Sequence, residues 1–222
     1  MKLKTFALLT ILAMFSYPAM AVIPCQPFIL KNGQPHDNMD CMEITDRQQY
    51  VAISFQGKFG IADRAGEVLV PMKYQEVNVD SNVAMFAVKD KGKWGYANDK
   101  GVMVVPLVYE EAFGFNTGLA GVKQNGKWGF IDSTGKMVIE PLYQEVSPFS
   151  NGLSAVKKDD KWGYIDNRGK TVIAFNYDVA YAFILYEKEV YAYVRQGEKY
   201  FYINKKGKKV NYSPPKQIPM PG

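Results

Sequence analysis

The chain has 222 residues, of which 47% are hydrophobic and 22% charged, a balance that is typical of globular proteins and excludes wholesale disorder. The formal net charge is +5 with lysines and acidic residues interspersed, so we expect no nucleic-acid partner. The single histidine argues against a histidine-based metal or catalytic centre. Aromatic residues reach 14%, beside 19 glycines, and this excess of strand and turn formers favours an all-β chain.

Residues 1–21 have the features of an export signal. Two lysines near the start precede an apolar run over residues 6–15, and Ala19-Met20-Ala21 forms a small-x-small cleavage site. We therefore expect cleavage between Ala21 and Val22 and a mature chain that is periplasmic or extracellular. A retained membrane anchor is the alternative, but the apolar run is too short to span a bilayer comfortably. We do not expect the mature chain to be an integral membrane protein after the signal is removed.

The segment 22–48 contains both cysteines of the chain, Cys25 and Cys41. In an oxidising compartment we expect a disulfide between them, which closes a loop of about 15 residues and stabilises the fold by about 3 kcal/mol. A redox or metal-binding pair is the alternative, but the spacing is not that of a Cys-x-x-Cys motif. The lone His36 lies in this loop, and the sequence leaves its role open.

A short motif recurs about every 34 residues from residue 57 onward. It combines a lysine, an aromatic residue and a glycine, and the fifth copy is degenerate. Because the aromatic residues are locked to the period, we expect a structural core role for them, and the absent Cβ of each glycine allows another backbone or ring to approach closely. The repeat-core residues are Phe59, Gly60, Trp94, Gly95, Trp128, Gly129, Trp162, Gly163 and Tyr200.

A second repeated feature is an Asp or Asn followed three residues later by a glycine. This pattern predicts a turn in which the side-chain oxygen accepts backbone N–H bonds and glycine takes the left-handed conformation. Calcium binding is the alternative, but too few oxygen ligands converge in each loop, so we expect no metal. The turn residues are Asp63, Gly66, Asn98, Gly101, Asp132, Gly135, Asp166 and Gly169.

Each unit is predicted to hold three strands. The first precedes the motif, the second contains it, and the third is a β-branched run that we expect to end at a proline, as at Pro71, Pro106 and Pro141. In each of the first four units a tyrosine lies eight residues beyond the turn glycine. Residues 144–149 suggest a short fourth element after this tyrosine. No long stretch shows a 3.6-residue apolar period, so we expect few helices.

With its K-W-G-[YF]-I-D-x-x-G pattern, the chain resembles the WG repeat family of bacterial proteins over about residues 50–212. The resemblance implies a β-rich repeat array, commonly in exported or envelope proteins, and it implies no catalytic residues. The first unit departs from the pattern with Phe59, and the fifth departs most with Tyr200. Since terminal repeats are often atypical, we interpret these two units as caps.

We therefore expect an all-β fold with about five three- to four-stranded antiparallel repeats. A propeller-like ring is favoured, and an open β-solenoid is the alternative. The domain organisation comprises a signal peptide (1–21), a disulfide-loop segment (22–48), the repeat domain (49–212) and a mobile proline-rich tail (213–222). The units lie near 49–80, 81–115, 116–149, 150–185 and 186–212.

The sequence favours a non-enzymatic scaffold that binds an envelope protein or a glycan, without a cofactor. Tyrosines outside the repeat register are the candidates for a binding surface: Tyr186, Tyr191, Tyr193 and Tyr212. One alternative is a hydrolase of envelope polymers with carboxylates in a cleft between repeats, although the acidic residues recur at repeat positions such as Glu76, Glu111 and Glu145. Another is a purely structural envelope component.

Overall fold

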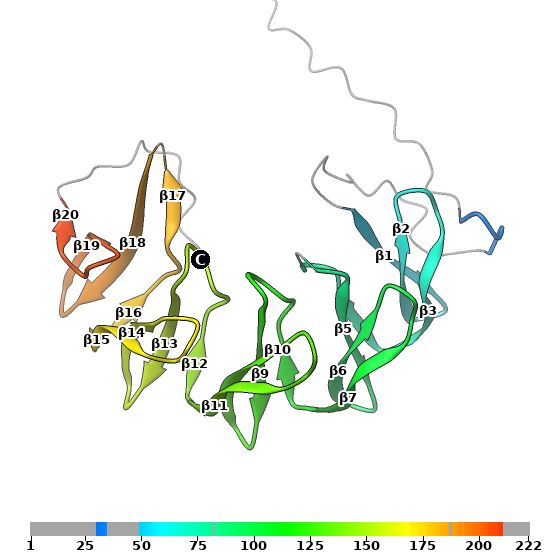
Figure 1. Cartoon of the computed structure of the whole chain (residues 1–222), viewed down its shortest axis with the longest axis horizontal. Helices are drawn as coiled ribbons and strands as arrows, with labels where there is room; N and C mark the ends of the chain where they lie inside the picture. The colour runs from blue at the N-terminus through cyan, green and yellow to red at the C-terminus, as the bar shows by residue number, and fades with distance from the viewer. Residues whose placement is uncertain (1–29, 35–48, 82, 187, 211–222) are drawn as a thin grey trace, which may run out of the picture.

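The computed structural model describes residues 30–34, 49–81, 83–186 and 188–210 (Figure 1). The regular secondary structure within these ranges consists of β-strands alone, which confirms the all-β prediction. The signal segment, the Cys25–Cys41 pair, His36, Tyr212 and the tail 213–222 lie outside the described residues.

The described strands form five antiparallel sheets that follow one another along the chain. The first sheet contains β1 (Tyr50–Phe55), β2 (Lys58–Asp63) and β3 (Val68–Tyr74). The second contains β4 (Glu76–Asn78), β5 (Met85–Asp90), β6 (Lys93–Asn98) and β7 (Met103–Tyr109). The third contains β8 (Glu111–Ala112), β9 (Leu119–Gln124), β10 (Lys127–Asp132) and β11 (Met137–Tyr143).

The last two sheets repeat this plan. The fourth contains β12 (Glu145–Val146), β13 (Ser154–Lys158), β14 (Lys161–Ile165) and β15 (Thr171–Tyr177). The fifth contains β16 (Val179–Ala180), β18 (Glu189–Gln196), β19 (Lys199–Asn204) and β20 (Lys209–Val210), and β17 (Ile184–Tyr186) also pairs with β18.

The short strand that follows each repeated tyrosine pairs with the next sheet. Glu111 lies opposite Lys123, and Glu145 lies opposite Lys157, so β8 and β12 are first strands and not last ones. One residue, such as Gln144, connects the end of one sheet to the start of the next. The second to fifth sheets therefore begin at residues 76, 111, 145 and 179, a few residues before the expected unit boundaries.

In the first three sheets, the strand that follows the motif strand continues beyond the proline at which the sequence pattern ended it. β7 includes Pro106 and runs on to Tyr109. Its register shifts against β6, because Trp94 pairs with Tyr109 whereas Tyr96 pairs with Val105. The proline therefore lies in a bulge inside an edge strand, where no ladder donor is required, and does not end the strand.

The glycine after each motif aromatic lies against this bulge. A Cβ on Gly95 would lie 2.5 Å from the carbonyl oxygen of Val105, and one on Gly129 would lie 2.5 Å from that of Ile139. Real Cβ atoms do not approach a backbone atom this closely, so only glycine fits beside the bulge.

Each of the three middle sheets packs through both of its faces. On the third sheet, Ala120, Val122 and Ile131 join an apolar cluster with the second sheet. Leu119, Trp128 and Phe130 point the opposite way and join a cluster with the fourth sheet. This alternation follows from the two-residue period of a strand, which places successive side chains on opposite faces. Below, the face toward the following sheet is called the forward face.

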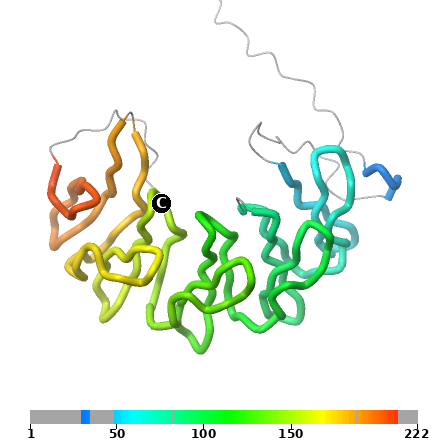
Figure 2. Tube along the Cα trace, viewed as in Figure 1, coloured from blue at the N-terminus to red at the C-terminus, as the bar shows by residue number. Residues whose placement is uncertain are grey.

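The sheets follow an open arc, with the first and fifth sheets at its two ends (Figures 1 and 2). Among the described residues, the extensive strand contacts between sheets all join neighbouring sheets. The face of the first sheet that points away from the second sheet is called its backward face. Leu30 is 1% exposed and covers this face by packing on Val51, Ile53 and Ala62. The Lys31 N–H also donates to the Gly66 carbonyl. Closure into the expected propeller-like ring is not confirmed.

Candidate binding surface on the last sheet

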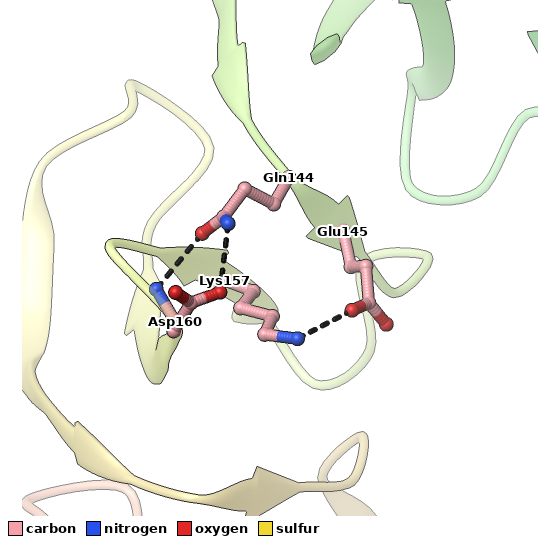
Figure 3. Close-up of polar contacts among 4 residues, drawn as sticks. All are labelled: Gln144, Glu145, Lys157 and Asp160. Atoms are coloured by element: carbon pink, nitrogen blue, oxygen red, sulfur yellow. Dashed lines mark hydrogen bonds and ion pairs between the residues drawn. The ribbon is translucent and has the colours of Figure 1, made fainter. Parts of the chain in front are cut away.

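The glutamates that recur in the repeats form ion pairs across neighbouring strands. Glu145 Oε1 lies 2.7 Å from Lys157 Nζ (Figure 3). Glu76 pairs with Lys89 and Glu111 pairs with Lys123 at equivalent positions. The hydrogen bond that Lys123 donates to Glu111 is the main cause that raises the pKa of this lysine. A lysine of the neighbouring strand is therefore the ion-pair partner of each repeated glutamate.

The polar residue directly after each repeated tyrosine binds the hairpin turn of the next sheet. Gln144 accepts the Asp160 N–H through Oε1 and donates to its carboxylate through Nε2, each over 2.9 Å (Figure 3). Three other residues accept turn N–H groups in the same way: Gln75, Glu110 and Asp178. Sequence reasoning missed this contact, although a polar residue at this repeat position was its signal.

The tryptophans are packing residues. Trp128 is 6% exposed and its ring stacks on that of Phe113, with centroids 4.6 Å apart. Trp94 and Trp162 are half-buried against the apolar clusters between sheets. Lys123 Nζ lies over the Trp128 ring, 5.8 Å from its centroid. The three rings therefore offer little surface to a glycan.

The predicted turn residues make the backbone contacts that their pattern suggests. Asp132 Oδ1 accepts the N–H groups of Thr134 and Lys136, and Gly135 has a φ of 85°. The fifth sheet repeats this turn, because Asn204 accepts the N–H groups of Lys206 and Lys208. Among the described residues, no group of three His, Cys, Asp or Glu side chains is placed to hold a metal ion.

The fifth sheet differs from the others in its forward face. Ala192, Val194 and Ile203 cover the fourth sheet, so the residues between them point the other way. Tyr193 pairs with Tyr202 on this second face, and Arg195 pairs with Tyr200. Within the described part of the chain, no sixth sheet covers these residues. We call the following set the terminal tyrosine face: Tyr181, Tyr191, Tyr193, Arg195, Tyr200 and Tyr202.

Tyrosine rings on this face form a nearly parallel row. The rings of Tyr193 and Tyr200 have centroids 5.3 Å apart and planes 18° apart. Tyr181 continues the row on the other side of Tyr193, at 6.1 Å and 25°. Tyr202 lies 4.8 Å from Tyr193 with a tilt of 40°. Burial raises the pKa of Tyr193, and the neighbouring Tyr200 and Tyr181 raise it further, so its hydroxyl stays neutral.

Tyr200 corrects one expectation from the sequence. It holds the tryptophan position of the fifth unit, for which the period predicts a core residue, yet it is 49% exposed. The equivalent Trp128 is buried because the fourth sheet follows it, whereas no described sheet follows Tyr200. The candidates Tyr191 and Tyr193 lie on the same face, and Tyr186 is half-buried at the end of β17, opposite Glu189.

Within the described ranges, no helix has the length and hydropathy needed to cross a membrane. A search of curated proteins finds no match.

Solved structures match the fold at low sequence identity. A structure described as "Crystal structure of the eukaryotic initiation factor" is 15% identical with a TM-score of 0.50, and the match covers 82% of this chain and 56% of that one. A structure of Kluyveromyces lactis Hsv2 is 14% identical with a TM-score of 0.48, covering 73% of this chain and 59% of that one. The chain thus spans less than two thirds of either, and the first likeness concerns the fold alone.

The family model described as "WG containing repeat" matches four consecutive segments, residues 59–94, 94–128, 128–162 and 162–200. Each match begins and ends at the motif aromatic, so that one full repeat lies between successive aromatic residues. Together the segments cover more than half of the chain. The chain therefore belongs to the WG-containing repeat family.

Proposed function

We propose that this protein is a non-enzymatic, exported repeat scaffold that binds an envelope protein or a glycan through its terminal tyrosine face. One observation carries the proposal: the forward face that docks the next sheet elsewhere in the array presents tyrosines and an arginine at the end of the arc. Tyrosine combines a large apolar ring with a polar hydroxyl and is favoured where a surface alternates between water and a partner.

We also propose that the arc stays open, as a short solenoid rather than a closed ring. Ring closure would require the first sheet to pack its backward face on the terminal tyrosine face. That backward face already holds Leu30, which is buried with Val51 and Ile53. Displacing Leu30 would remove its apolar contacts, so the covered first sheet favours an open arc with an accessible last sheet.

A non-catalytic role is supported by the use of the repeated acidic side chains. Glu76, Glu111 and Glu145 are held by lysines of the neighbouring strand, and Asp132 accepts the hydrogen bonds of a turn. These contacts give each carboxylate a structural task, which leaves the hydrolase alternative without a favoured pair.

A structural role in an envelope assembly is a second candidate function. The outer strands β7, β11 and β15 lie along the convex side of the arc (Figure 1) and carry exposed apolar side chains: Val104, Val108, Val138, Leu142 and Val172. Such side chains repeated along one side can serve association with another protein.

The proposal is tested by binding experiments with a matched pair of variants. The Tyr193→Ala/Tyr200→Ala variant removes two rings of the terminal tyrosine face, and the Val108→Ala/Leu142→Ala variant removes two exposed apolar side chains from the outer strands. Each protein is applied to a glycan array and used in a pull-down from an envelope extract. We expect wild type and the outer-strand variant to retain the same glycan or protein and the tyrosine variant to lose it.

Two results would contradict the proposal. One is retention by the tyrosine variant of every partner that wild type binds, and the other is the absence of any partner in both experiments. Loss of binding only in the outer-strand variant would instead favour the assembly role. Circular dichroism and thermal unfolding of the three proteins establish that each variant is folded.

A further inference from the structure

The fifth sheet lacks one member of an ion pair that the three preceding sheets contain. In those sheets a glutamate on the first strand lies opposite a lysine on the second strand, as in the Glu111–Lys123 pair. In the fifth sheet the equivalent pair is Val179 and Arg195. The basic residue is therefore retained, whereas the carboxylate that neutralises it elsewhere is replaced by an apolar side chain.

The Arg195 side chain is left with an unsatisfied donor. Its Nε is buried and has no hydrogen-bond partner among the described residues. The pKa of Asp178 is lowered mainly by the hydrogen bond from Lys161 and then by that from the Gly197 N–H, and the charge of Arg195 adds to this effect. However, Asp178 already accepts hydrogen bonds from Lys161 Nζ and the Gly197 N–H. A guanidinium group prefers a carboxylate in a two-bond arrangement, and nothing in the described fold supplies one.

Arg195 belongs to the row of tyrosine rings. Its guanidinium carbon lies 5.9 Å from the ring centroid of Tyr200, and the rings of Tyr200, Tyr193 and Tyr181 follow one another at 5.3 and 6.1 Å. Exposed residues of both charges lie next to this row: Glu198 in the turn before β19, Lys199 at the start of β19, and Lys206 and Lys208 in the turn after it. Lys209 lies on the opposite face, with its Nζ over the Phe201 ring. The face therefore combines a row of stacked tyrosine rings with the positive charge of Arg195.

We propose that the terminal tyrosine face binds a carboxylated glycan, whose carboxylate contacts Arg195 in place of the missing glutamate. This inference rests on the proposed binding function and names its ligand class. Because the tyrosine rings stack on one another, the row offers a ligand mainly ring edges and hydroxyls. Sugar hydroxyls can exchange hydrogen bonds with such a row of phenol hydroxyls, and sugar C–H groups can pack on the ring edges. The carboxylate supplies the negative partner that Glu111 and its equivalents supply to the lysines of the preceding sheets, and salt weakens this attraction.

An acidic protein segment is disfavoured by the aromatic row. A flexible acidic peptide can satisfy Arg195 through charge alone, and it makes no use of the row of tyrosine hydroxyls, in which neighbouring rings lie within 25° of parallel. A neutral glycan, conversely, can use the rings but leaves the Arg195 charge without a partner. The carboxylated glycan is the ligand class that accounts for both features.

The test restores the missing carboxylate within the protein. In the Val179→Glu variant, the new side chain lies opposite Arg195, as Glu111 lies opposite Lys123. The third sheet tolerates two adjoining acidic residues at the equivalent positions, Glu110 and Glu111. The neutral Val179→Gln variant is the matched control, and Arg195→Gln is a second route to the same loss.

Binding is measured by isothermal titration calorimetry with hexagalacturonate, with its methyl ester and with polyglutamate. We expect wild type and Val179→Gln to bind hexagalacturonate with similar affinity. We expect Val179→Glu and Arg195→Gln to bind it at least about tenfold more weakly, a loss in the range of one charged hydrogen-bonded contact. The methyl ester should bind wild type at least about tenfold more weakly than the free acid.

Several outcomes would overturn the inference. One is equal affinity of wild type, Val179→Glu and Arg195→Gln for hexagalacturonate. Another is equal affinity of wild type for hexagalacturonate and its methyl ester. A third is the absence of any binding of hexagalacturonate to wild type. Tighter binding of polyglutamate than of hexagalacturonate would identify an acidic protein partner instead. Tyrosine-dependent binding of a neutral glycan or a protein would leave the proposed function intact while the carboxylated-glycan inference fails.

Discussion

In the first four sheets, the glycine after the motif aromatic residue is required because the backbone of the next strand lies directly against it. A Cβ on Gly129 would lie 2.5 Å from the Ile139 oxygen and 2.8 Å from the Pro141 nitrogen. The bulge of β11 brings this backbone close, and a backbone atom cannot move aside as the end of a flexible side chain can. The turn residue Gly126 differs, since a Cβ there would meet nothing within 4 Å, although its φ is 71°.

We therefore predict a large difference between two glycine substitutions. Gly129→Ala should lower the free energy of unfolding by about 3 kcal/mol or more, because strands β10 and β11 must separate. Gly126→Ala should cost only about 1 kcal/mol, the penalty of a left-handed non-glycine residue. Urea unfolding followed by tryptophan fluorescence measures both, and equal costs would show that the close approach is not the reason for the glycine.

Buried tyrosine hydroxyls link consecutive sheets. Tyr96 donates to the Phe113 carbonyl over 2.7 Å, and Tyr164 donates to the Tyr181 carbonyl over 2.9 Å. Burial is the main cause that raises the pKa of each tyrosine, and Tyr109 adds to it for Tyr96. Phe130 holds the equivalent position in the third sheet, so the ring fits there without a hydroxyl.

These raised pKa values predict a loss of stability at alkaline pH. Stability from a neutral buried tyrosine is fully present below the unfolded-state pKa of about 10 and is lost as the pH rises from there towards the higher folded-state value. Tyr96→Phe and Tyr164→Phe should each cost about 1 kcal/mol at pH 7. The double variant should lose less further stability between pH 9 and 11 than wild type, as measured by urea unfolding; parallel curves would contradict this.

At the scale of the element, the Asx turns are built alike with charged or neutral side chains. Asp132 and Asn98 both accept two backbone N–H groups through Oδ1. Asp132 additionally accepts the Thr134 hydroxyl, and this hydrogen bond is the main cause that lowers its pKa. The turn contribution of Asp132 is therefore present above the unfolded-state pKa of about 3.9 and is lost as the pH falls through the lower folded-state value.

We predict that Asp132→Asn changes stability at pH 7 by less than about 0.5 kcal/mol, since asparagine forms the same turn. Asp132→Ala should cost about 1 kcal/mol, because the turn N–H groups lose their acceptor. Below pH 4 the Asn variant should lose less stability than wild type. Thermal unfolding between pH 2.5 and 7 tests this, with Asn98→Ala as the control whose cost should not depend on pH in that range.

The sequence could predict the strands and turns because their signals are local and repeat. It could not predict where a sheet begins, since a period can be cut at any position. Only the pairing of Glu111 with Lys123 assigns β8 to the sheet that follows it. Tyr191 and Tyr193 could be selected because they depart from the repeat register. Tyr200 could not, because its position is in the repeat register, and it is exposed where no described sheet follows it.

At the scale of the whole molecule, the two ends of the arc have different chemistry. The first sheet is covered by the fully buried Leu30, and the last sheet presents tyrosines and Arg195. In a repeat array each unit is stabilised mainly by its neighbours. The cover at the first end is therefore expected to protect the first sheet and to have little effect on the last one.

Leu30→Ala should lower the stability of the first sheet by about 2–4 kcal/mol, the usual cost of removing a buried leucine side chain. Amide hydrogen exchange should accelerate in β1–β3 and stay unchanged in β18 and β19. Leu185→Ala, at a residue that is 63% exposed, is the control and should change stability by less than about 0.5 kcal/mol. Faster exchange across all five sheets would contradict a nearest-neighbour array.

The central claim is that the last sheet presents its forward face to a partner. The most direct measurement compares the affinity of wild type for its retained glycan or protein with that of Tyr193→Ala/Tyr200→Ala and of Val108→Ala/Leu142→Ala. Removal of the two tyrosine rings should weaken binding at least about tenfold, since each buried ring contributes about 1 kcal/mol or more at an interface. The outer-strand variant should bind as wild type does. Equal affinity of wild type and the tyrosine variant would contradict the account.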